Sequence, residues 1–465
     1  MSQLNPSSRG RAVERGVRVQ WRRNPSHEPW QTTREGRVLE QQNITSQLGF
    51  FSSLVHQDYR RLWIATGCAQ SASWALIILR AALVYNLTQS NAWVGFVTMA
   101  AHLPSLVVTP FAGFLADRLD RRRVLAATYS LNLAHNVILA LLVLSGQVTA
   151  WQILGLAILN GCFRATEMPT NQALLPNLVP RDCLLNAVAL NQLMQQGARM
   201  LGPMLLLPVI HFIGHETAFF VSTGLYAIGW SQVVRIRTVS RGTLEASRGI
   251  FFNLAAGIGY IYTHPMVFAI MILTVLHCAL TMAFESVLPY FSRSILGMTT
   301  GGDLFKGPTY LMIGVGAGGI VGNLALARIQ GSKIRGQLFL WVGLASGLTP
   351  IVFGLTATVS QAMLAATTMG ASTAAFMTLS HGMIQALAPD GIRGRVMGAN
   401  TWHAQGTMAG FNAINGVLMD MPWMTVPILL SSTGFAFVVI MFGSLLAAHI
   451  RAIYARGIPA VVHAQ

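Results

Sequence analysis

Beyond a polar N-terminal segment, the chain alternates between long apolar stretches and short polar loops. A helix that crosses the hydrocarbon core of a bilayer needs roughly 20 mainly apolar residues. The expected membrane helices lie near 61–86, 92–116, 123–145, 150–171, 184–211, 216–236, 264–291, 308–329, 336–356, 358–386, 395–418 and 424–450. The pattern therefore predicts an all-α polytopic membrane protein with about twelve transmembrane helices.

A longer polar stretch, 237–263, separates the sixth expected helix from the seventh. Within it, 249–262 is apolar but short and interrupted by glycines, which predicts an amphipathic helix on the membrane surface. We therefore expect four regions: an arginine-rich tail over 1–50, a six-helix bundle over 51–236, a cytosolic linker over 237–263 and a second six-helix bundle over 264–456.

The composition agrees with a membrane protein, because 53% of the residues are hydrophobic and only 10% are charged. Soluble domains carry about 25% charged residues. The formal charge of +16 falls mostly at predicted helix ends, so it indicates membrane topology rather than nucleic-acid binding. With the N-terminus inside, the outer loops hold only Arg293 and Lys306, and the positive-inside rule then predicts that both termini are cytosolic.

The first 50 residues hold eight arginines and no apolar run, so they do not form a secretory signal. Two interpretations remain open, a disordered cytosolic tail and a polybasic arm that touches anionic lipid. The four cysteines are scattered and show no CxxC or Cys/His spacing, so we expect neither a disulfide framework nor a metal site.

Five charged residues lie inside the apolar stretches: Arg80, Arg164, Glu167, Arg199 and Glu285. A charge in hydrocarbon is unfavourable, so such residues usually line a polar path or form buried pairs. A polar interior of this kind indicates transport. Three arginines against two glutamates leave the interior mildly positive, which suits a substrate with carboxylate or catecholate groups.

Arg80 and Glu285 occupy equivalent places in the first and seventh expected helices, at similar depths. We hypothesise that they pair between the two halves when the outer gate is shut; alternatively, each bonds within its own half or reaches the outer surface. Arg164 and Glu167 are three residues apart on one helix face and are expected to pair. That pair is structural or gating, or it serves proton coupling through Glu167.

Polar and aromatic residues on three expected helices are candidates for lining a central cavity. Arg199 lies near mid-membrane, where it either attracts a polar or anionic substrate or forms a salt bridge with a neighbouring helix. The other cavity candidates are Trp74, Gln195, Asn400 and His403. Core or lipid packing is the alternative for the aromatic side chain, and an interhelical hydrogen bond is the alternative for the histidine.

The second expected helix is followed by Gly113-Phe-Leu-Ala-Asp117-Arg118-Leu-Asp120-Arg121-Arg122-Arg123. This stretch resembles the loop signature G-x-x-x-D-R-x-G-R-R of the major facilitator superfamily, with Asp120 in place of a glycine. The resemblance implies that Asp117 is stabilised by Arg118 or by the N-terminus of the eleventh helix, which begins near Arg393. The arginines Arg121 and Arg122 keep the loop cytosolic, and Asp120 is free to cap the third helix.

Further stretches resemble the enterobactin-exporter-like branch of that superfamily, which includes siderophore and macrolide exporters. They are 58–63, 164–176, 185–187 and 393–396, and the resemblance covers about 55–455. It implies a major facilitator fold of two six-helix bundles, in the cytoplasmic membrane of a bacterium, as a monomer without a cofactor. Gly197-Ala-Arg199-Met-Leu-Gly202-Pro203 is similar to the family's antiporter motif without its closing glycines; an ordinary proline-kinked packing helix is the alternative.

These features predict a secondary active transporter that exports a small molecule, driven by protons through the family resemblance. Two alternatives come from other classes, a membrane-embedded enzyme that modifies lipid and a non-transporting membrane sensor. The chain has no H-E-x-x-H or G-x-S-x-G motif for an enzyme and no G-x-x-x-x-G-K-[ST] phosphate loop for ATP. Only the arginine-rich tail hints at a sensor.

Overall fold

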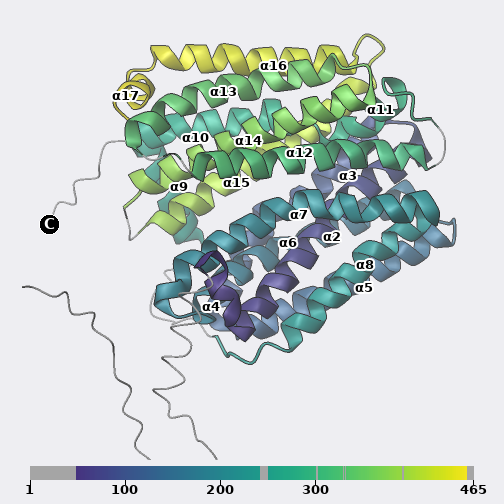
Figure 1. Ribbon diagram of the computed structural model, residues 1–465, viewed down its shortest axis with the longest axis horizontal. Helices are drawn as coiled ribbons and strands as arrows, with labels where there is room; N and C mark the ends of the chain where they lie inside the picture. Colours follow the sequence, from purple (N-terminus) through teal and green to yellow (C-terminus); the bar gives the residue numbers. More distant parts are fainter. Residues whose placement is uncertain are drawn as a thin grey trace, which may run out of the picture. The chain divides into compact units, whose positions relative to one another are not determined.

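The computed structural model describes residues 49–240, 250–299, 302–327, 329, 331–389 and 392–457. Every regular element in these ranges is a helix, as predicted (Figure 1). The predicted tail over 1–50 lies almost wholly outside the described residues, and so does the part of the linker over 241–249.

The first half begins with the short 3-10 helix η1 (Gly49–Val55) and continues through seven helices. They are α2 (Gln57–Thr88), α3 (Asn91–His102), α4 (Pro104–Arg118), α5 (Arg121–Leu144), α6 (Ala150–Leu174), α7 (Leu184–Phe212) and α8 (His215–Val234). The second half contains α9 (Ile250–Thr263), α10 (Pro265–His277), α11 (Leu288–Ser294), α12 (Asp303–Ala327), α13 (Ser332–Gly354), α14 (Val359–Leu387), α15 (Arg393–Met419), α16 (Val426–Gly443) and α17 (Ala448–Arg456).

Eight helical segments of the described chain are long and apolar enough to cross a membrane. They are Gln57–Thr88, Asn91–Thr109, Arg121–Leu144, Pro265–Ser294, Asp303–Ala327, Ser332–Gly354, Val359–Leu387 and Val426–Leu446. Helices α6, α7, α8 and α15 occupy the other four predicted positions but are not among the eight. Three of them, α6, α7 and α15, carry most of the predicted site residues, whose polar side chains lower the apolar character of these helices.

Three predicted helices are interrupted in the structure. The predicted helix 92–116 is divided into α3 and α4 before Pro104, which has no N–H group to continue the helical hydrogen bonds. The predicted helix 264–291 contains a π-helical segment, η5 (Cys278–Met282), a non-helical Ala283 and a 3-10 turn, η6 (Glu285–Val287). The predicted helix 424–450 ends at α16 and the short turn η7 (Ser444–Leu446), and α17 follows as a separate helix.

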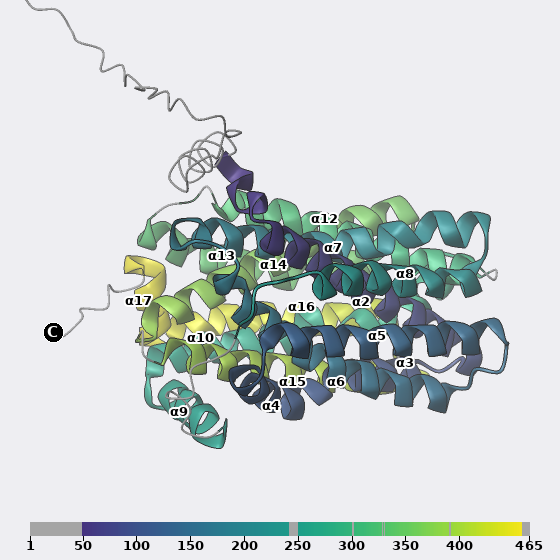
Figure 2. The same cartoon turned by 90° about the horizontal axis from the view of Figure 1, so that it is seen from below.

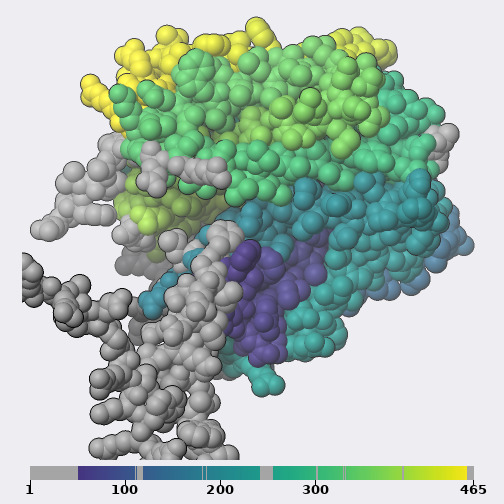
Figure 3. Space-filling view, viewed as in Figure 1, coloured from purple at the N-terminus to yellow at the C-terminus, as the bar shows by residue number. Residues whose placement is uncertain are grey.

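Helices α2–α8 form one group and helices α10–α16 another, and most helices pack within their own group (Figures 1 and 2). The surface view shows the two groups as separate blocks, purple to teal and green to yellow, that meet along a seam (Figure 3). The main contacts between the groups join α3 to α15 and α7 to α12. Helix α9 has nearly the same bounds as the predicted amphipathic helix over 249–262, and it packs on α15.

Glycines permit the close approach of α3 and α15. A Cβ atom on Gly95 would lie 2.7 Å from the carbonyl oxygen of Asn412, and one on Gly416 would collide with the carbonyl oxygen of Asn91. Both obstacles are backbone atoms, which cannot rotate away. The absence of side chains at these two positions therefore allows the two halves to touch here.

Replacement of Gly416 by valine is expected to destabilise the protein by about 1–3 kcal/mol, as overpacking does elsewhere. The reason is that valine would force α15 away from α3. Gly410→Val is the matched control, because a Cβ atom on Gly410 of the same helix meets nothing within 4 Å. Thermal unfolding of both purified variants checks this prediction, and an equal melting temperature for the two would contradict it.

Candidate functional site

A buried carboxylate of the second half meets two basic side chains of the first half. Glu285 is 3% exposed and lies within the break between α10 and α11, where it begins the turn η6. Its Oε2 lies 3.6 Å from Nε2 of His102, and its Oε1 lies 3.8 Å from Nη2 of Arg199. The guanidinium carbon of Arg199 lies 4.4 Å from the ring centre of Trp74, a cation–π contact. The Glu285 site therefore joins α2, α3, α7 and the broken helix.

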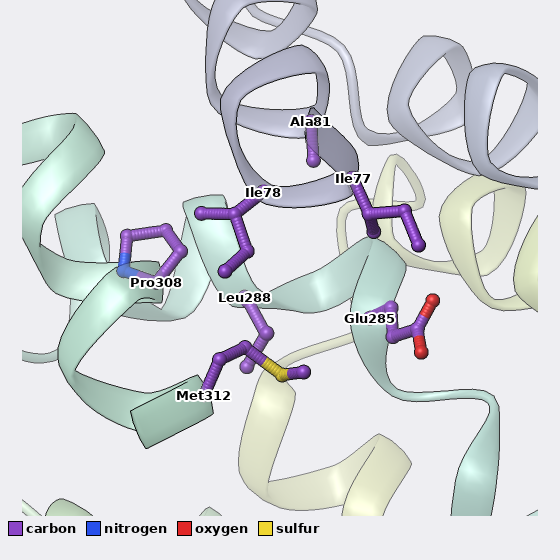
Figure 4. A pocket seen from close by; sticks show the side chains of 7 residues that line it. All are labelled: Ile77, Ile78, Ala81, Glu285, Leu288, Pro308 and Met312. Carbon is purple, nitrogen blue, oxygen red and sulfur yellow. The ribbon is translucent and has the colours of Figure 1, made fainter. Parts of the chain in front are cut away.

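A small cavity borders Glu285 (Figure 4). Its open volume is about 10 Å³, close to the smallest that holds one water molecule. Apolar side chains of α2, α11 and α12 line it, and the carboxylate of Glu285 turns away from Pro308 and Met312 (Figure 4). Neither carboxylate oxygen accepts a hydrogen bond from a described residue. Glu285 is thus held by charge rather than by close hydrogen bonds.

Two asparagines of α15 stabilise the helix break that presents Glu285. Asn415 Nδ2 donates a hydrogen bond to the carbonyl oxygen of Ala283 (2.6 Å). Asn412 Oδ1 accepts one from the backbone N–H of Ser286 (3.2 Å). Irregular backbone at membrane depth is tolerated where other groups satisfy the freed N–H and C=O groups. These asparagines were not predicted, although an amide inside an apolar stretch was a signal available in the sequence.

The predicted pair of Arg80 and Glu285 is wrong for this structure. Arg80 is 1% exposed, and its Nη2 donates to Oδ1 of Asn160 (3.1 Å), within its own half. Asn160 Nδ2 donates to Oδ1 of Asn132 (2.9 Å), and Asn132 Nδ2 donates to Oε2 of Glu167 (3.4 Å). The depth estimate assumed a regular seventh helix, whereas the break before Glu285 changes the direction of that side chain.

The predicted direct pair of Arg164 and Glu167 is also wrong. The carboxylate of Glu167 is buried and accepts from Asn132 instead. Arg164 is half-buried and forms no hydrogen bond or ion pair with any described residue. It nevertheless lies near enough to interact electrostatically with Arg80, Glu167 and Glu285. The two charges are therefore neighbours without contact.

The other predicted cavity residues are dispersed. Gln195 is half-buried and lies one helical turn before Arg199 on α7. Asn400 is fully buried on α15, and its amide has no hydrogen-bond partner among the described residues. His403 is oriented toward the linker helix, where its Nε2 lies 3.5 Å from the hydroxyl of Tyr262. The structure thus brings Arg199 and Trp74 to Glu285, and places His403 elsewhere.

The loop between α4 and α5 carries the predicted conformational motif. The side chains of Asp117 and Arg118 and the surroundings of Gly113 lie outside the described part, so the role of Asp117 stays a prediction. Asp120 caps α5, because its Oδ1 accepts from the backbone N–H of Arg122 (3.1 Å). This is the role that its departure from the glycine of the signature suggested.

Arginines of this region bind carbonyl groups at nearby helix ends. Arg121 Nη1 donates to the carbonyl of Ala173 (3.0 Å), and Arg122 Nη1 donates to that of Ile236 (3.1 Å). At the start of α15, Arg393 Nε donates to the carbonyl of Gln385 (2.9 Å). These bonds attach the loops to α6, to the end of α8 and to α14.

Helix α7 contains the predicted bend motif with Gly197, Gly202 and Pro203. A Cβ atom on Gly202 would collide with the carbonyl oxygen of Ser71, so α7 approaches α2 closely here. Gly197 has open space around it. Of the two glycines, Gly202 therefore has the packing role that the alternative interpretation of this motif required.

A second carboxylate joins the two halves at the opposite end of α3 from His102. Asp420, directly after α15, accepts hydrogen bonds from Ser90 Oγ (2.6 Å), Asn91 N (2.7 Å), Asn91 Nδ2 (3.0 Å) and Ala92 N (3.1 Å). These groups form the N-terminus of α3, where a negative charge is favoured. We call Asp420 with Ser90, Asn91 and Ala92 the Asp420 latch. Burial raises the pKa of Asp420, but the hydrogen bonds from Ser90, Ala92 and Asn91 lower it further, so the net pKa lies below its ordinary value.

Comparison with known proteins adds to this geometry. A family model described as transmembrane secretion effector matches residues 48–455. The staphyloferrin A transporter of Staphylococcus aureus is 26% identical over 251 residues, which are 52% of this chain and 60% of the relative. Macrolide efflux protein A of Streptococcus pyogenes is 21% identical over 258 residues, 54% of this chain and 62% of the relative. Each alignment therefore covers less than two thirds of the relative's length.

The solved structure of the nucleoside transporter NupG superposes with a TM-score of 0.68 at 12% identity, over 83% of this chain and 99% of that one. At such low identity the likeness shows the fold alone. These comparisons match transporters and give no support to the two alternatives from the sequence, a lipid-modifying enzyme and a membrane sensor.

Proposed function

Because the chain belongs to the transmembrane secretion effector family of the major facilitator superfamily, as its motifs predicted, we propose that it exports a small molecule by secondary active transport. In this proposal it is a monomer in the bacterial cytoplasmic membrane. Twelve helices span the bilayer as two six-helix bundles, over 51–236 and 264–456, with the linker over 237–263 and both termini in the cytosol. Siderophores and macrolide-like compounds are the candidate substrates, in line with the names of its relatives.

The observation that carries this proposal is the Glu285 site. It holds an ionisable group from one half against basic groups of the other half, at a buried position between them. Loading or unloading a proton at Glu285 changes the attraction to His102 and Arg199, and so changes how strongly the halves adhere. That is the requirement for a coupling site in a transporter that rocks two bundles around a central site.

Glu167 is the second candidate for proton coupling. It is buried, hydrogen-bonded through two asparagines to Arg80, and lies near Arg164. Protonation of Glu167 would remove the negative charge that is linked to Arg80 through the asparagines and that lies near Arg164. The hydrogen bonds through Asn132 and Asn160 therefore connect the protonation of Glu167 to the position of Arg80.

Inside-out membrane vesicles that contain the protein test the function. We expect a pH gradient to drive accumulation of at least one compound from a panel of siderophores and macrolides, unchanged in chemical structure. A protonophore should abolish the accumulation, and vesicles from cells without the protein give the background. Turnover of a lipid, or accumulation that survives the protonophore, would contradict proton-coupled export.

A further inference from the structure

Of the five charged residues inside the apolar stretches, one cation forms no ion pair or hydrogen bond with a described residue. Glu285 faces Arg199, and Glu167 is joined to Arg80 through Asn160 and Asn132. Arg164 has neither a hydrogen bond nor an ion pair with a described residue. A cation within a membrane bundle normally pairs with another group or faces a polar path.

Arg164 lies on the same face of α6 as Asn160 and Glu167, which are buried and hydrogen-bonded to Asn132. It follows Asn160 by four residues and precedes Glu167 by three, and residues at these spacings are neighbours on a helix surface. Asn160 and Glu167 point into the bundle, because both are buried and bonded to α5. Arg164 therefore also faces the interior, and it is only half-buried, so part of this residue remains accessible.

The guanidinium of Arg80, near Arg164, has a nitrogen that is free to donate a further hydrogen bond. Nη1 of Arg80 is buried without a hydrogen-bond partner among the described residues, although Nη2 is bonded to Asn160. Arg80 and Arg164 lie near enough for their like charges to repel each other. In a medium of low dielectric this repulsion is substantial and is relieved by an anion between or beside them.

We propose that Arg164, assisted by Nη1 of Arg80, binds a carboxylate group of the transported molecule. The guanidinium fork matches the planar geometry of a carboxylate, and bonds between these groups are among the stronger hydrogen bonds in proteins. A single carboxylate balances the five charged side chains of the interior, since three arginines then face two glutamates and one bound anion. This inference rests on the proposed function, because it names the substrate class of the same interior.

A matched pair of fluorescent probes tests the inference, dansylglycine with a carboxylate and dansylglycinamide without one. Binding to the purified full-length protein is followed by energy transfer from tryptophan to the dansyl group. We expect wild type to bind the acid at least about tenfold more tightly than the amide, the size of one charged hydrogen bond. Arg164→Gln is expected to remove this preference, whereas Arg164→Lys keeps part of it.

Arg60→Gln is the control, because Arg60 is an exposed arginine at the start of α2 and lies outside the site. It is expected to bind both probes as wild type does. Equal affinities of wild type for acid and amide, no binding of the acid up to about 10 mM (a free energy weaker than about 3 kcal/mol), or an unchanged preference in Arg164→Gln would each overturn the inference. Should Arg164→Gln not be recovered in folded form, the wild-type comparison and Arg164→Lys still decide.

Transport of the same probes in vesicles separates this inference from the proposed function. Gradient-driven movement of both probes with equal affinity would overturn the carboxylate site and leave proton-coupled export standing. Selective binding of the acid without any gradient-driven movement of the acid would do the reverse.

Discussion

Replacement of Glu285 by glutamine is expected to abolish gradient-driven export while the protein still folds. Glutamine keeps the shape of the side chain but removes the charge that attracts Arg199 and His102. Breaking a buried ion pair costs about 3 kcal/mol or more, which changes the ratio of molecules with the two halves joined at Glu285 to those with the halves apart by roughly 100-fold. The measurement is the initial rate of substrate accumulation in vesicles under a pH gradient, normalised to the amount of protein.

The same variant has a second readout that a purely structural role would not give. If Glu285 carries the proton, Glu285→Gln resembles the permanently protonated state, so exchange of substrate without a gradient should persist. Glu216→Gln is the control, because the side chain of Glu216 at the start of α8 is 47% exposed. Wild-type accumulation by a folded Glu285→Gln protein would remove Glu285 from the coupling mechanism.

Replacement of Asp420 by alanine is expected to open the side of the protein that the Asp420 latch closes. The carboxylate accepts four hydrogen bonds from the N-terminus of α3, all of which alanine loses. A total of about 2 kcal/mol changes the ratio of closed to open molecules by roughly 30-fold. The check is the labelling rate of Ala81→Cys, beside the small cavity, by an impermeant maleimide in a background without the four native cysteines.

The pH dependence of the latch follows from the lowered pKa of Asp420. Its ordinary value is 3.8. The carboxylate stabilises the closed state fully above this value, and the stabilisation is lost as the pH falls through the lower pKa of the closed state. Labelling of the parent Ala81→Cys protein should therefore stay constant at neutral pH and rise only in acid below 3.8. Asp182→Ala, at an exposed position between α6 and α7, is the control; the same labelling rate for Asp420→Ala and this control would exclude a latch.

Much of the fold follows from apolar length alone, because lipid requires each crossing segment to be helical and long. The sequence therefore predicts the helical character of the chain and the approximate positions of its helices, whereas eight of the described helical segments are long and apolar enough to cross a membrane. It does not predict the break between α10 and α11, since residues 278–287 are mainly apolar and contain no glycine or proline. The caps from Asn412 and Asn415 that stabilise this break come from a distant part of the chain.

The sequence predicted two charged members of the candidate site, Glu285 and Arg199, but neither His102 nor the pairings between the charged groups. Charge inside apolar stretches identified Glu285, Arg199 and Arg80, because burial of charge is unfavourable wherever it occurs. Which cation meets which carboxylate depends on side-chain direction, which the helix break changes. The Asp420 latch was missed because its carboxylate follows a predicted helix, at a position where a charge is ordinary.

The asparagine caps have a consequence for communication across the protein. Asn412 and Asn415 bind the backbone around Glu285, and Asp420 ends the same helix eight residues beyond Asn412. At 1.5 Å per residue, about 12 Å of α15 separates Asn412 from Asp420. A change at Glu285 therefore needs no relay of rearranging side chains to be felt at that end. We expect a displacement of helix α15 alone to carry the change from Glu285 to Asp420.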